Sequence, residues 1–363
     1  MDKRIIIAGG GTGGHIFPAI AIANAIKQLA PQTKFLFVGA VGKMEMEKVP
    51  QAGFEIVGLP IAGFNRSSLI KNIGLPIKLI HSFLKVSSIV KKFKPDAVLG
   101  VGGYSTYPVL KYAQLKGIPT FIHEANSYAG KSNQLLGKKA TMIFTATDGM
   151  EKFFSADKIK VTGNPIRSAI VERSIDKGVA LASFGCKKTQ TTVLSVGGSL
   201  GALSINEAIL KHIDLFEQNN LQLIWQTGKG FYNKAKLASS GRSNVYVSDF
   251  IVKMEDAYAA ADIVISRSGA MSIAELCAVG KPVVFVPFPF AAEDHQKVNA
   301  QKLVDKQAAL MIEDKNVLEK LVPAIIELSK NKKMQEELIN NIQQLKILDA
   351  DKIVAKEILN HLK

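Results

Sequence analysis

One short stretch near the start of the chain combines the residue types that a catalytic loop needs. Residues 9–15 contain five glycines, a threonine and a histidine, between an apolar run at residues 4–8 and a second apolar segment from Ile16. Glycines let the backbone turn sharply and leave amide N–H groups accessible, and a helix N-terminus attracts anions. His15 is the one side chain in this loop that can move a proton near neutral pH. It could be a catalytic base, or it could only cap or pack against the helix.

The same loop matches the G-x-G-x-x-G pattern of dinucleotide-binding units through Gly9, Gly11 and Gly14. Dinucleotide binding also needs an acidic residue at the end of the second strand, where it binds a ribose hydroxyl. The second apolar run, residues 35–38, continues into residues 39–42 without a carboxylate. The sequence therefore disfavours a nicotinamide-dependent oxidoreductase.

The composition restricts the class of protein and its partners. A length of 363 residues predicts two domains, and the net charge of +15 favours anionic partners. We expect no nucleic-acid partner, because no dense basic block is interleaved with aromatic residues. Cys186 and Cys277 are too few for a disulfide framework, which fits a reduced, cytoplasmic setting. No apolar run approaches the roughly 18 residues of a membrane-spanning helix.

Short apolar runs alternate with helical patterns, which predicts parallel sheets built from βαβ units. The strands predicted in the first half are residues 4–8, 35–38, 55–59, 97–101, 120–123 and 141–145. Those predicted in the second half are residues 191–196, 221–226, 245–247, 263–266, 283–286 and 308–312. A turn-rich segment at residues 161–167 separates the two series. We therefore expect Rossmann-like domains at 1–163 and 164–347, followed by a helix within 348–363 that could pack on either half.

Two further glycine-rich turns follow predicted strands. Residues 197–202 open the second series, and residues 102–108 follow the fourth strand of the first half. Such turns lie at the carboxyl edges of parallel sheets, where open α/β folds bind their ligands. If the two halves face each other, all three glycine loops line one cleft.

Residues 74–94 carry more apolar surface than a helix with one buried face requires. At helical spacing they form one stripe of Ile77, Ile80 and Leu84 and another of Leu79, Phe83, Val86, Val90 and Phe93. Lys78, Lys85 and Lys92 recur on the polar side. The segment could be a helix buried on two sides, or an apolar patch with a lysine rim that rests on an anionic bilayer.

An ordered set of motifs resembles the bacterial peptidoglycan glycosyltransferases that make lipid II. The motifs are GGGTGGHIFPA from residue 9, GVGGYSTYP from 100, HEAN from 123, GNPIR from 163, GGSLGA from 197, SRSGAMSIAE from 266 and VPFPFAAEDHQKVNA from 286. The set extends over nearly the whole chain in the family's order, so it is highly specific.

The resemblance implies a GT-B fold, in which two Rossmann-like domains face each other across a cleft. It implies transfer of N-acetylglucosamine from UDP-GlcNAc to the C4 hydroxyl of the MurNAc unit of lipid I, the undecaprenyl-pyrophosphoryl-MurNAc-pentapeptide, which gives lipid II. Inversion at the anomeric carbon, no metal and no cofactor are expected. The family acts peripherally on the cytoplasmic face of the inner membrane, where contacts with other cell-wall enzymes are also expected.

The resemblance also assigns residues. His15 corresponds to the proposed general base. The donor-binding positions are Thr12, Gly13, Gly14, Asn126, Arg167, Ser199, Ile251, Ala270, Met271, Ser272, Ile273, Ala274, Glu275 and Gln296. Among them, the backbone of Ile251 reads the uracil ring and Glu275 binds the ribose hydroxyls. From their positions in the sequence we assign Tyr104 to the acceptor site, and Leu79, Phe83, Lys78 and Lys85 to a membrane surface.

The chemistry of inverting transfer is consistent with these residues. The acceptor hydroxyl needs a base, and the leaving diphosphate needs stabilisation by a metal or by helix N-termini and cations. No His/Cys set has metal-ligand spacing, whereas the turn at Ser199 supplies amides before a helix. Arg267 could add positive charge or form a structural ion pair, and Glu275 could instead simply favour a helix start.

Two other functions are compatible with such a fold. A UDP-GlcNAc 2-epimerase, or a glycosyltransferase with another lipid acceptor, would use the same donor, and acceptor dependence distinguishes them. A non-catalytic sugar-nucleotide-binding or scaffold protein would bind the donor without turnover, and its binding would survive loss of His15.

Overall fold

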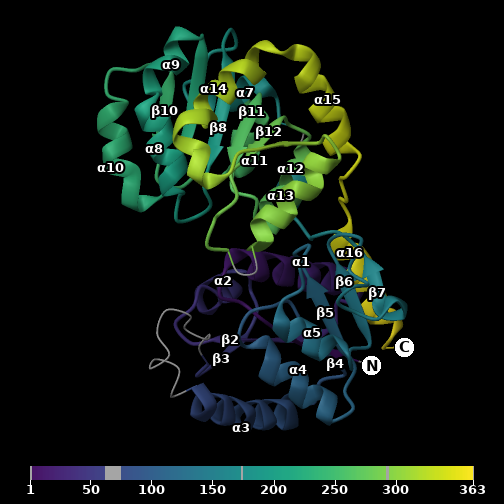
Figure 1. Ribbon diagram of the computed structural model, residues 1–363. Coiled ribbons are helices and arrows are strands. Elements are labelled where there is room, and N and C mark those ends of the chain that lie inside the picture. Colours follow the sequence, from purple (N-terminus) through teal and green to yellow (C-terminus); the bar gives the residue numbers. More distant parts are fainter. Residues whose placement is uncertain (1, 62–74, 173–174, 292–293, 363) are drawn as a thin grey trace. The chain divides into compact units, whose positions relative to one another are not determined.

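The computed structural model describes residues 2–61, 75–172, 175–291 and 294–362 (Figure 1). Contacts between Cα atoms divide the chain into two compact units. Unit 1 comprises the chain up to Ile166 together with the residues from Leu348 onward, and unit 2 runs from Arg167 to Ile347. The boundary predicted after residue 163 lies close to this division.

Unit 1 is built on seven parallel strands in the order β3-β2-β1-β4-β5-β6-β7. The strands are β1 (Arg4–Ala8), β2 (Lys34–Ala40), β3 (Ile56–Leu59), β4 (Ala97–Gly100), β5 (Thr120–Glu124), β6 (Met142–Thr145) and β7 (Ile159–Val161). The helices are α1 (Gly13–Leu29), α2 (Glu45–Gln51), α3 (Leu75–Phe93), α4 (Thr106–Leu115), α5 (Lys131–Gly137) and α16 (Ala350–Asn360), with a 3₁₀ turn at Ala156–Lys158. β1 pairs with β2 on one side and β4 on the other, so the strand order reverses there. Ligands of such folds bind at this reversal.

The central strand of unit 1 is buried on both faces, as its uninterrupted apolar sequence indicates. Successive side chains of a strand point to opposite faces of the sheet. Ile5 accordingly packs in a cluster with Ile22 of α1, and Ile6 packs in another with Leu110 of α4. Helices therefore cover both faces of the sheet. Polar loops can reach solvent only at the ends of the strands, and the glycine-rich loops lie at the carboxyl ends.

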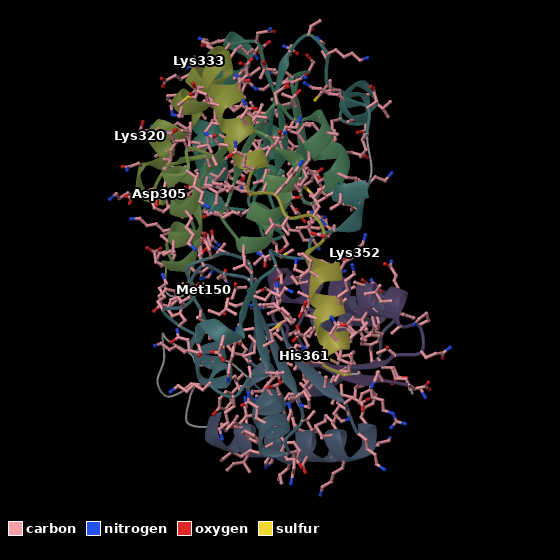
Figure 2. All side chains as sticks on the ribbon, turned by 90° about the vertical axis from the view of Figure 1, so that its right-hand side faces the viewer. Met150, Asp305, Lys320, Lys333, Lys352 and His361 are labelled. Carbon is pink, nitrogen blue, oxygen red and sulfur yellow. The ribbon has the colours of Figure 1, made fainter. Side chains whose placement is uncertain are left out.

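The last helix of the chain belongs to unit 1. Ile358 of α16 lies in the same buried cluster as α1, and Lys160 of β7 forms an ion pair with Glu357. In Figure 2, Lys352 and His361 mark the two ends of this helix. The sequence left open which half this helix packs on, and the structure shows that α16 packs on unit 1.

Unit 2 contains six parallel strands in the order β10-β9-β8-β11-β12-β13. The strands are β8 (Thr191–Val196), β9 (Leu221–Gln226), β10 (Val245–Ser248), β11 (Ile263–Ser266), β12 (Val283–Phe285) and β13 (Leu310–Met311). The helices are α6 (Ser168–Glu172), α7 (Lys177–Ser183), α8 (Leu203–Lys211), α9 (Ile213–Gln218), α10 (Lys229–Ala238), α11 (Met254–Ala260), α12 (Ala270–Val279), α13 (His295–Asp305), α14 (Val317–Lys330) and α15 (Lys332–Gln343), with a 3₁₀ turn at Asp314–Asn316. The strand order reverses between β8 and β11, as it does at β1 in unit 1.

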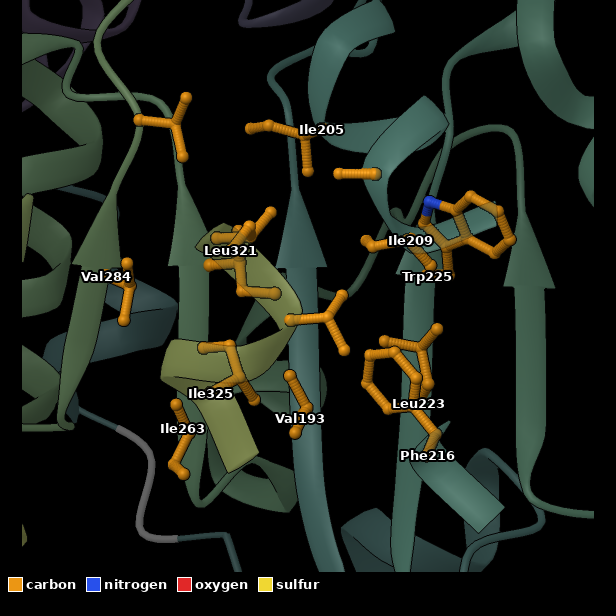
Figure 3. Close-up of a cluster of buried hydrophobic side chains, with 14 of the residues drawn as sticks. Val193, Ile205, Ile209, Phe216, Leu223, Trp225, Ile263, Val284, Leu321 and Ile325 are labelled. Carbon is orange, nitrogen blue, oxygen red and sulfur yellow. The ribbon is translucent and has the colours of Figure 1, made fainter. Parts of the chain in front are cut away.

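One face of the unit 2 sheet is covered by an apolar core that includes a buried tryptophan (Figure 3). Leu321 and Ile325 of α14 pack over the strands, and Trp225 is fully buried. Its indole N–H donates to Oδ1 of Asn206 over 2.9 Å, and the Asn206 amide donates to the Thr227 carbonyl over 2.8 Å. Because Thr227 directly follows β9, this buried network connects the core to the loop edge of the sheet.

The strands predicted from apolar runs are all present within a few residues of their predicted bounds. Strand β7 (Ile159–Val161) was missed. It lies at the edge of the unit 1 sheet and its residues are half-buried or exposed, so no buried apolar run marks it. The helix predicted within 74–94 is α3, which begins at Leu75, and Gly74 lies outside the described residues.

Candidate functional site

Two glycine loops of unit 1 contact each other at the carboxyl edge of the sheet. In the loop after β1, the Gly10 N–H donates to the Gly102 carbonyl of the loop after β4, over 3.1 Å. A Cβ on Gly9 would lie 2.5 Å from the same carbonyl oxygen, and a Cβ on Gly103 would overlap the Gly10 backbone. Glycine permits this close approach, so the two motifs form one continuous backbone surface.

His15 lies in the first turn of α1, against this surface. A Cβ on Gly102 would lie 2.7 Å from Cδ2 and Nε2 of its ring. Its Nδ1 is 3.0 Å from the Gly10 carbonyl oxygen and 3.4 Å from the Thr12 hydroxyl. Because a carbonyl only accepts hydrogen bonds, the Gly10 contact requires the proton on Nδ1. In the neutral ring Nε2 then carries the lone pair, which is the form that a general base needs.

A second histidine, His123 at the end of β5, is buried and uncharged at neutral pH. Its side chain is 1% exposed, and Nε2 lies 3.4 Å from the Gly163 carbonyl oxygen. No hydrogen-bond partner for its Nδ1 occurs among the described residues. Burial lowers the pKa of His123 to about 4, the Gly163 contact opposes this shift, and the charge of His15 adds to it.

We expect the stability of unit 1 to fall as the pH is lowered from about 6.5 to about 4. The ordinary pKa of histidine is 6.5 and that of folded His123 is about 4, so the unfolded chain binds the extra proton in this interval. The full difference is on the order of 3 kcal/mol. His123→Gln keeps a donor for Gly163 and does not titrate. When urea unfolding is measured at pH 7 and at pH 4.5, the free energy of unfolding of this variant should therefore fall less than that of the wild type. Equal falls would contradict a lowered pKa of His123.

Glu124 shapes the loop that carries the predicted donor-binding residue Asn126. Its carboxylate is buried and accepts the backbone N–H groups of Asn126 and Gly130, each over 3.1 Å. It also accepts the Asn133 amide over 2.8 Å. These contacts show that the Glu124 carboxylate organises the loop between β5 and α5.

In unit 2, the glycine turn after β8 leads into helix α8. Gly198 and Gly201 have φ values of 84° and 77°, which favour glycine, and a Cβ on Gly201 would overlap the Thr227 carbonyl. Ser199 is exposed between them. The first amides of a helix have no partner within it, so this turn can present N–H groups to an anion.

Gln226, at the end of β9, connects this turn to the predicted uracil-binding residue. Its amide N–H donates to the Gly198 carbonyl over 3.0 Å, and its Oε1 accepts the Ile251 N–H over 2.9 Å. Both Gln226 and Ile251 are buried. One side chain thus fixes two of the predicted donor-binding segments relative to each other.

The structure brings the predicted residues Arg167 and Glu275 together in a two-pronged ion pair. Nε and Nη2 of Arg167 each lie 2.8 Å from a different oxygen of Glu275, and the Tyr258 hydroxyl donates to Glu275 Oε2 over 3.2 Å. Burial and the charge of Glu275 raise the pKa of Tyr258 well above its usual value, so it remains a donor. Contacts with Arg167 and Tyr258 therefore orient the carboxylate.

Arg267 is a structural cation. Its Nη1 donates to the carbonyl oxygens of Val286 and Pro287, each over 3.0 Å, and pairs with Asp314 at 2.6 Å. Its guanidinium also lies 5.5 Å from the ring centre of Phe288. Of the two roles considered for Arg267, the ion pair is the one observed.

The remaining predicted positions of unit 2 lie around the start of α12. Helix α12 begins at Ala270, directly after Gly269, and its first residues through Ala274 are half-buried. Gln296 accepts the Phe288 N–H through Oε1 over 3.0 Å, and its carbonyl accepts the Ser268 hydroxyl over 2.8 Å. Arg167, Ser199, Ile251, Glu275 and Gln296 therefore all belong to unit 2, whereas Thr12, His15 and Asn126 belong to unit 1.

The exposed stripe of α3 differs from the one chosen from the sequence. Leu79 and Phe83 are half-buried because they share the stripe of Val86 and Val90, which belongs to the core. The stripe of Ile77, Ile80 and Leu84 is 59–67% exposed. Lys78 is exposed, and Lys85 donates to the Gly58 carbonyl over 2.8 Å. Tyr104 is 51% exposed on its glycine loop.

The described residues form neither a metal-binding cluster nor a membrane-spanning helix. Among the described residues, no group of three or more His, Cys, Asp or Glu side chains is arranged to hold a metal ion. None of the helices in the described ranges is long and apolar enough to span a membrane.

Three polar residues that contact the predicted site segments were not predicted from the sequence, and one of them, Glu45, accepts the Gly11 N–H of the first glycine loop. They are Glu45, Gln226 and Tyr258. In the sequence, Glu45 looks like an ordinary acidic residue in the first turn of a helix. Gln226 and Tyr258 lie within or beside apolar runs. No spacing pattern marks any of them, because each contacts a residue that is distant in sequence.

Two Rossmann-like parallel sheets, each with a glycine-rich strand-to-helix turn at its carboxyl edge, define the GT-B fold. The model of the glycosyltransferase family 28 N-terminal domain matches residues 5–145, and that of the C-terminal domain matches residues 192–354. The chain therefore belongs to glycosyltransferase family 28.

Individual relatives agree with this assignment. A protein from Bacteroides thetaiotaomicron, named UDP-N-acetylglucosamine--N-acetylmuramyl-(pentapeptide) pyrophosphoryl-undecaprenol N-acetylglucosamine transferase, is 51% identical over 99% of this chain and 98% of its own length. A protein of the same name from Bacteroides fragilis is 48% identical over 98% of this chain and 95% of its own. The crystal structure of Acinetobacter baumannii MurG superposes with a TM-score of 0.79 at 26% identity and covers 99% of both chains.

Proposed function

We propose that this protein transfers N-acetylglucosamine from UDP-GlcNAc to the C4 hydroxyl of the MurNAc unit of undecaprenyl-pyrophosphoryl-MurNAc-pentapeptide, forming lipid II. The observation that carries the proposal is the 51% identity, over nearly the full length, to a relative named for this reaction. The transfer inverts the anomeric carbon and uses no metal. Unit 1 supplies the base and the acceptor side, and unit 2 binds the donor.

His15 is the base in this proposal. Its Nδ1–H contacts the Gly10 carbonyl, so Nε2 can take the proton of the acceptor C4 hydroxyl. The C4 oxygen attacks the anomeric carbon from the face opposite UDP, the bond from that carbon to the diphosphate oxygen breaks, and UDP leaves. Single-step displacement inverts the configuration. Tyr104, exposed beside the same glycine loops, lines the acceptor side.

Donor recognition rests mainly on unit 2. The turn at Ser199 and the N-terminus of α8 offer amides to the diphosphate. The Ile251 backbone reads the uracil, while Glu275 accepts the ribose hydroxyls and Arg167 adds positive charge beside them. Residues Ala270, Met271, Ser272, Ile273 and Ala274 line the donor at the start of α12, and Gln296 contacts the sugar. From unit 1, Thr12, Gly13, Gly14 and Asn126 contact the donor sugar nucleotide.

The proposal is tested with radiolabelled UDP-GlcNAc and a short-chain lipid I analogue in the presence of EDTA. Formation of labelled disaccharide-lipid is the expected result, and it would support the reaction, the acceptor and metal independence together. Release of UDP, or formation of N-acetylmannosamine, without labelled lipid would contradict the acceptor assignment and favour a 2-epimerase or another acceptor.

We further propose that the protein works peripherally on an anionic membrane surface, through α3. Its stripe of Ile77, Ile80 and Leu84 is exposed, Lys78 lies beside it, and the chain carries a net charge of +15. Apolar side chains flanked by lysines insert shallowly into the interface of an anionic bilayer. Such a surface would bring the enzyme to its lipid-linked acceptor.

Ile80→Glu combined with Leu84→Glu should weaken binding to anionic vesicles at least about tenfold, because two apolar side chains no longer leave water. Activity on a detergent-soluble acceptor should stay near the wild-type value. Val179→Glu with Leu237→Glu, at exposed apolar positions of unit 2, is the matched control. Vesicle co-sedimentation measures the effect, and equal binding of the two double variants would argue against α3 as the contact.

A further inference from the structure

A buried carboxylate lies directly against the first glycine loop. Glu45, the first residue of α2, is 1% exposed. Its Oε2 accepts the Gly11 N–H over 2.7 Å, and its Oε1 accepts the Ala40 N–H over 2.9 Å. A Cβ on Gly10 or Gly39 would overlap this side chain. These two glycines therefore make room for Glu45, and the Gly11 amide is already occupied.

The peptide group between Gly10 and Gly11 contacts both Glu45 and His15. Its N–H donates to Glu45 over 2.7 Å, and its carbonyl oxygen lies 3.0 Å from His15 Nδ1. A carboxylate bound to a peptide N–H polarises that peptide, which makes its carbonyl a stronger acceptor. In serine proteases a carboxylate bonded directly to the Nδ1–H of a histidine fixes its tautomer and stabilises the imidazolium. Here one peptide group lies between the carboxylate and the ring.

We propose that Glu45 is a positioning residue for His15 and acts through the Gly10–Gly11 peptide. It fixes the carbonyl that binds Nδ1–H, and its negative charge stabilises the imidazolium formed when Nε2 takes the acceptor proton. This inference rests on the proposed role of His15 as the base.

Other polar groups of unit 1 lie on the elements around this loop, and His123 is near enough for the charge of His15 to lower its pKa. On β5, His123 is buried and Glu124 binds the Asn126 and Gly130 amides. On α2, Glu47 and Lys48 pair with each other at the surface. On α4, uncharged Thr106 faces the second loop and donates to the Gly102 carbonyl over 2.9 Å. The carboxylate of Glu45, in contrast, is hydrogen-bonded directly to the loop that holds His15.

Kinetics of Glu45→Gln test the proposal. We expect kcat to fall roughly 10–100-fold, the scale known for hydrogen-bond partners that orient metal-ligating histidines. The KM for UDP-GlcNAc should change less than about threefold. The acid limb of the pH–rate profile should move to lower pH, because the imidazolium loses a stabilising charge. Glu47→Gln, an exposed neighbour on α2, is the control and should change neither quantity.

A double variant separates an effect through His15 from general damage. In a His15→Ala background, Glu45→Gln should change the remaining activity less than about twofold, because residues that act as a unit are not additive. Equal fold losses in both backgrounds would overturn the proposal. If Glu45→Gln does not fold, Glu45→Asp replaces it; that variant retains the charge and should keep the acid limb in place, and a shifted limb would count against the proposal.

NMR of ¹⁵N-labelled histidine tests the connection without turnover. The wild-type His15 signal should report the Nδ1–H tautomer, and Glu45→Gln should increase the Nε2–H form. An unchanged tautomer in the variant would overturn the role of Glu45. Normal turnover of His15→Ala would instead refute the role of His15 as the base. The NMR result would still show whether Glu45 controls the tautomer of the His15 ring.

Discussion

His15→Ala should lower transfer of N-acetylglucosamine by roughly 10²–10⁴-fold, the usual contribution of a general base. Binding of UDP-GlcNAc should remain within about threefold of wild type, because most of the proposed donor contacts belong to unit 2. The geometry supports this expectation, since the Gly10 carbonyl requires a proton on Nδ1 and leaves Nε2 as the basic atom. Single-turnover transfer to a lipid I analogue, with calorimetric titration of UDP-GlcNAc, measures the two quantities separately.

His212→Ala is a suitable control, because His212 lies in unit 2 and its Nε2 contacts the backbone carbonyl of Leu318 over 3.1 Å. This variant should transfer at close to the wild-type rate. Activity of His15→Ala within about tenfold of wild type would show that His15 only packs at the start of α1. A parallel loss of UDP-GlcNAc binding would indicate a disturbed loop rather than a lost base.

The fold could be predicted largely because unit 1 and unit 2 are built from parallel strands buried on both faces. Such strands have continuous apolar sequences, as at Ile5, Ile6 and Ile7, and these are easily found. β7 (Ile159–Val161) is an edge strand without such a run, so it was missed. Both apolar stripes of α3 were predicted from their helical spacing. Which stripe faces water depends on how α3 packs against α4, and the spacing of apolar residues carries no information on that packing.

The site was predictable where glycines and a histidine lie in one loop, and unpredictable where a side chain acts from another element. Glu45 follows β2 in sequence and supports the loop after β1, and Gln226 joins two loops from the end of β9. The dinucleotide pattern requires a carboxylate at the end of the second strand for a ribose. The nearby carboxylate, Glu45, instead accepts the backbone N–H groups of Gly11 and Ala40, so it supports the loop.

Glu275→Gln should remove most of the preference for a ribose over a deoxyribose. Hydrogen bonds from the ribose hydroxyls to a carboxylate contribute about 1.5–3 kcal/mol, so the wild type should bind UDP roughly 10–100-fold more tightly than 2′,3′-dideoxy-UDP. In the variant the ratio should fall to within about threefold. Calorimetric titration of both nucleotides with both proteins measures the ratio directly, and it cancels any general loss of affinity caused by disturbing Arg167.

Tyr258→Phe is the matched control, because it removes one donor from the same carboxylate while Arg167 still binds both oxygens at 2.8 Å. It should weaken nucleotide binding only slightly and keep the preference for the ribose. If Glu275→Gln also keeps that preference, then the carboxylate serves only the ion pair with Arg167. If both variants lose it, the orientation set by Tyr258 matters as much as the charge, because a carboxylate binds two neighbouring hydroxyls only when both oxygens face them.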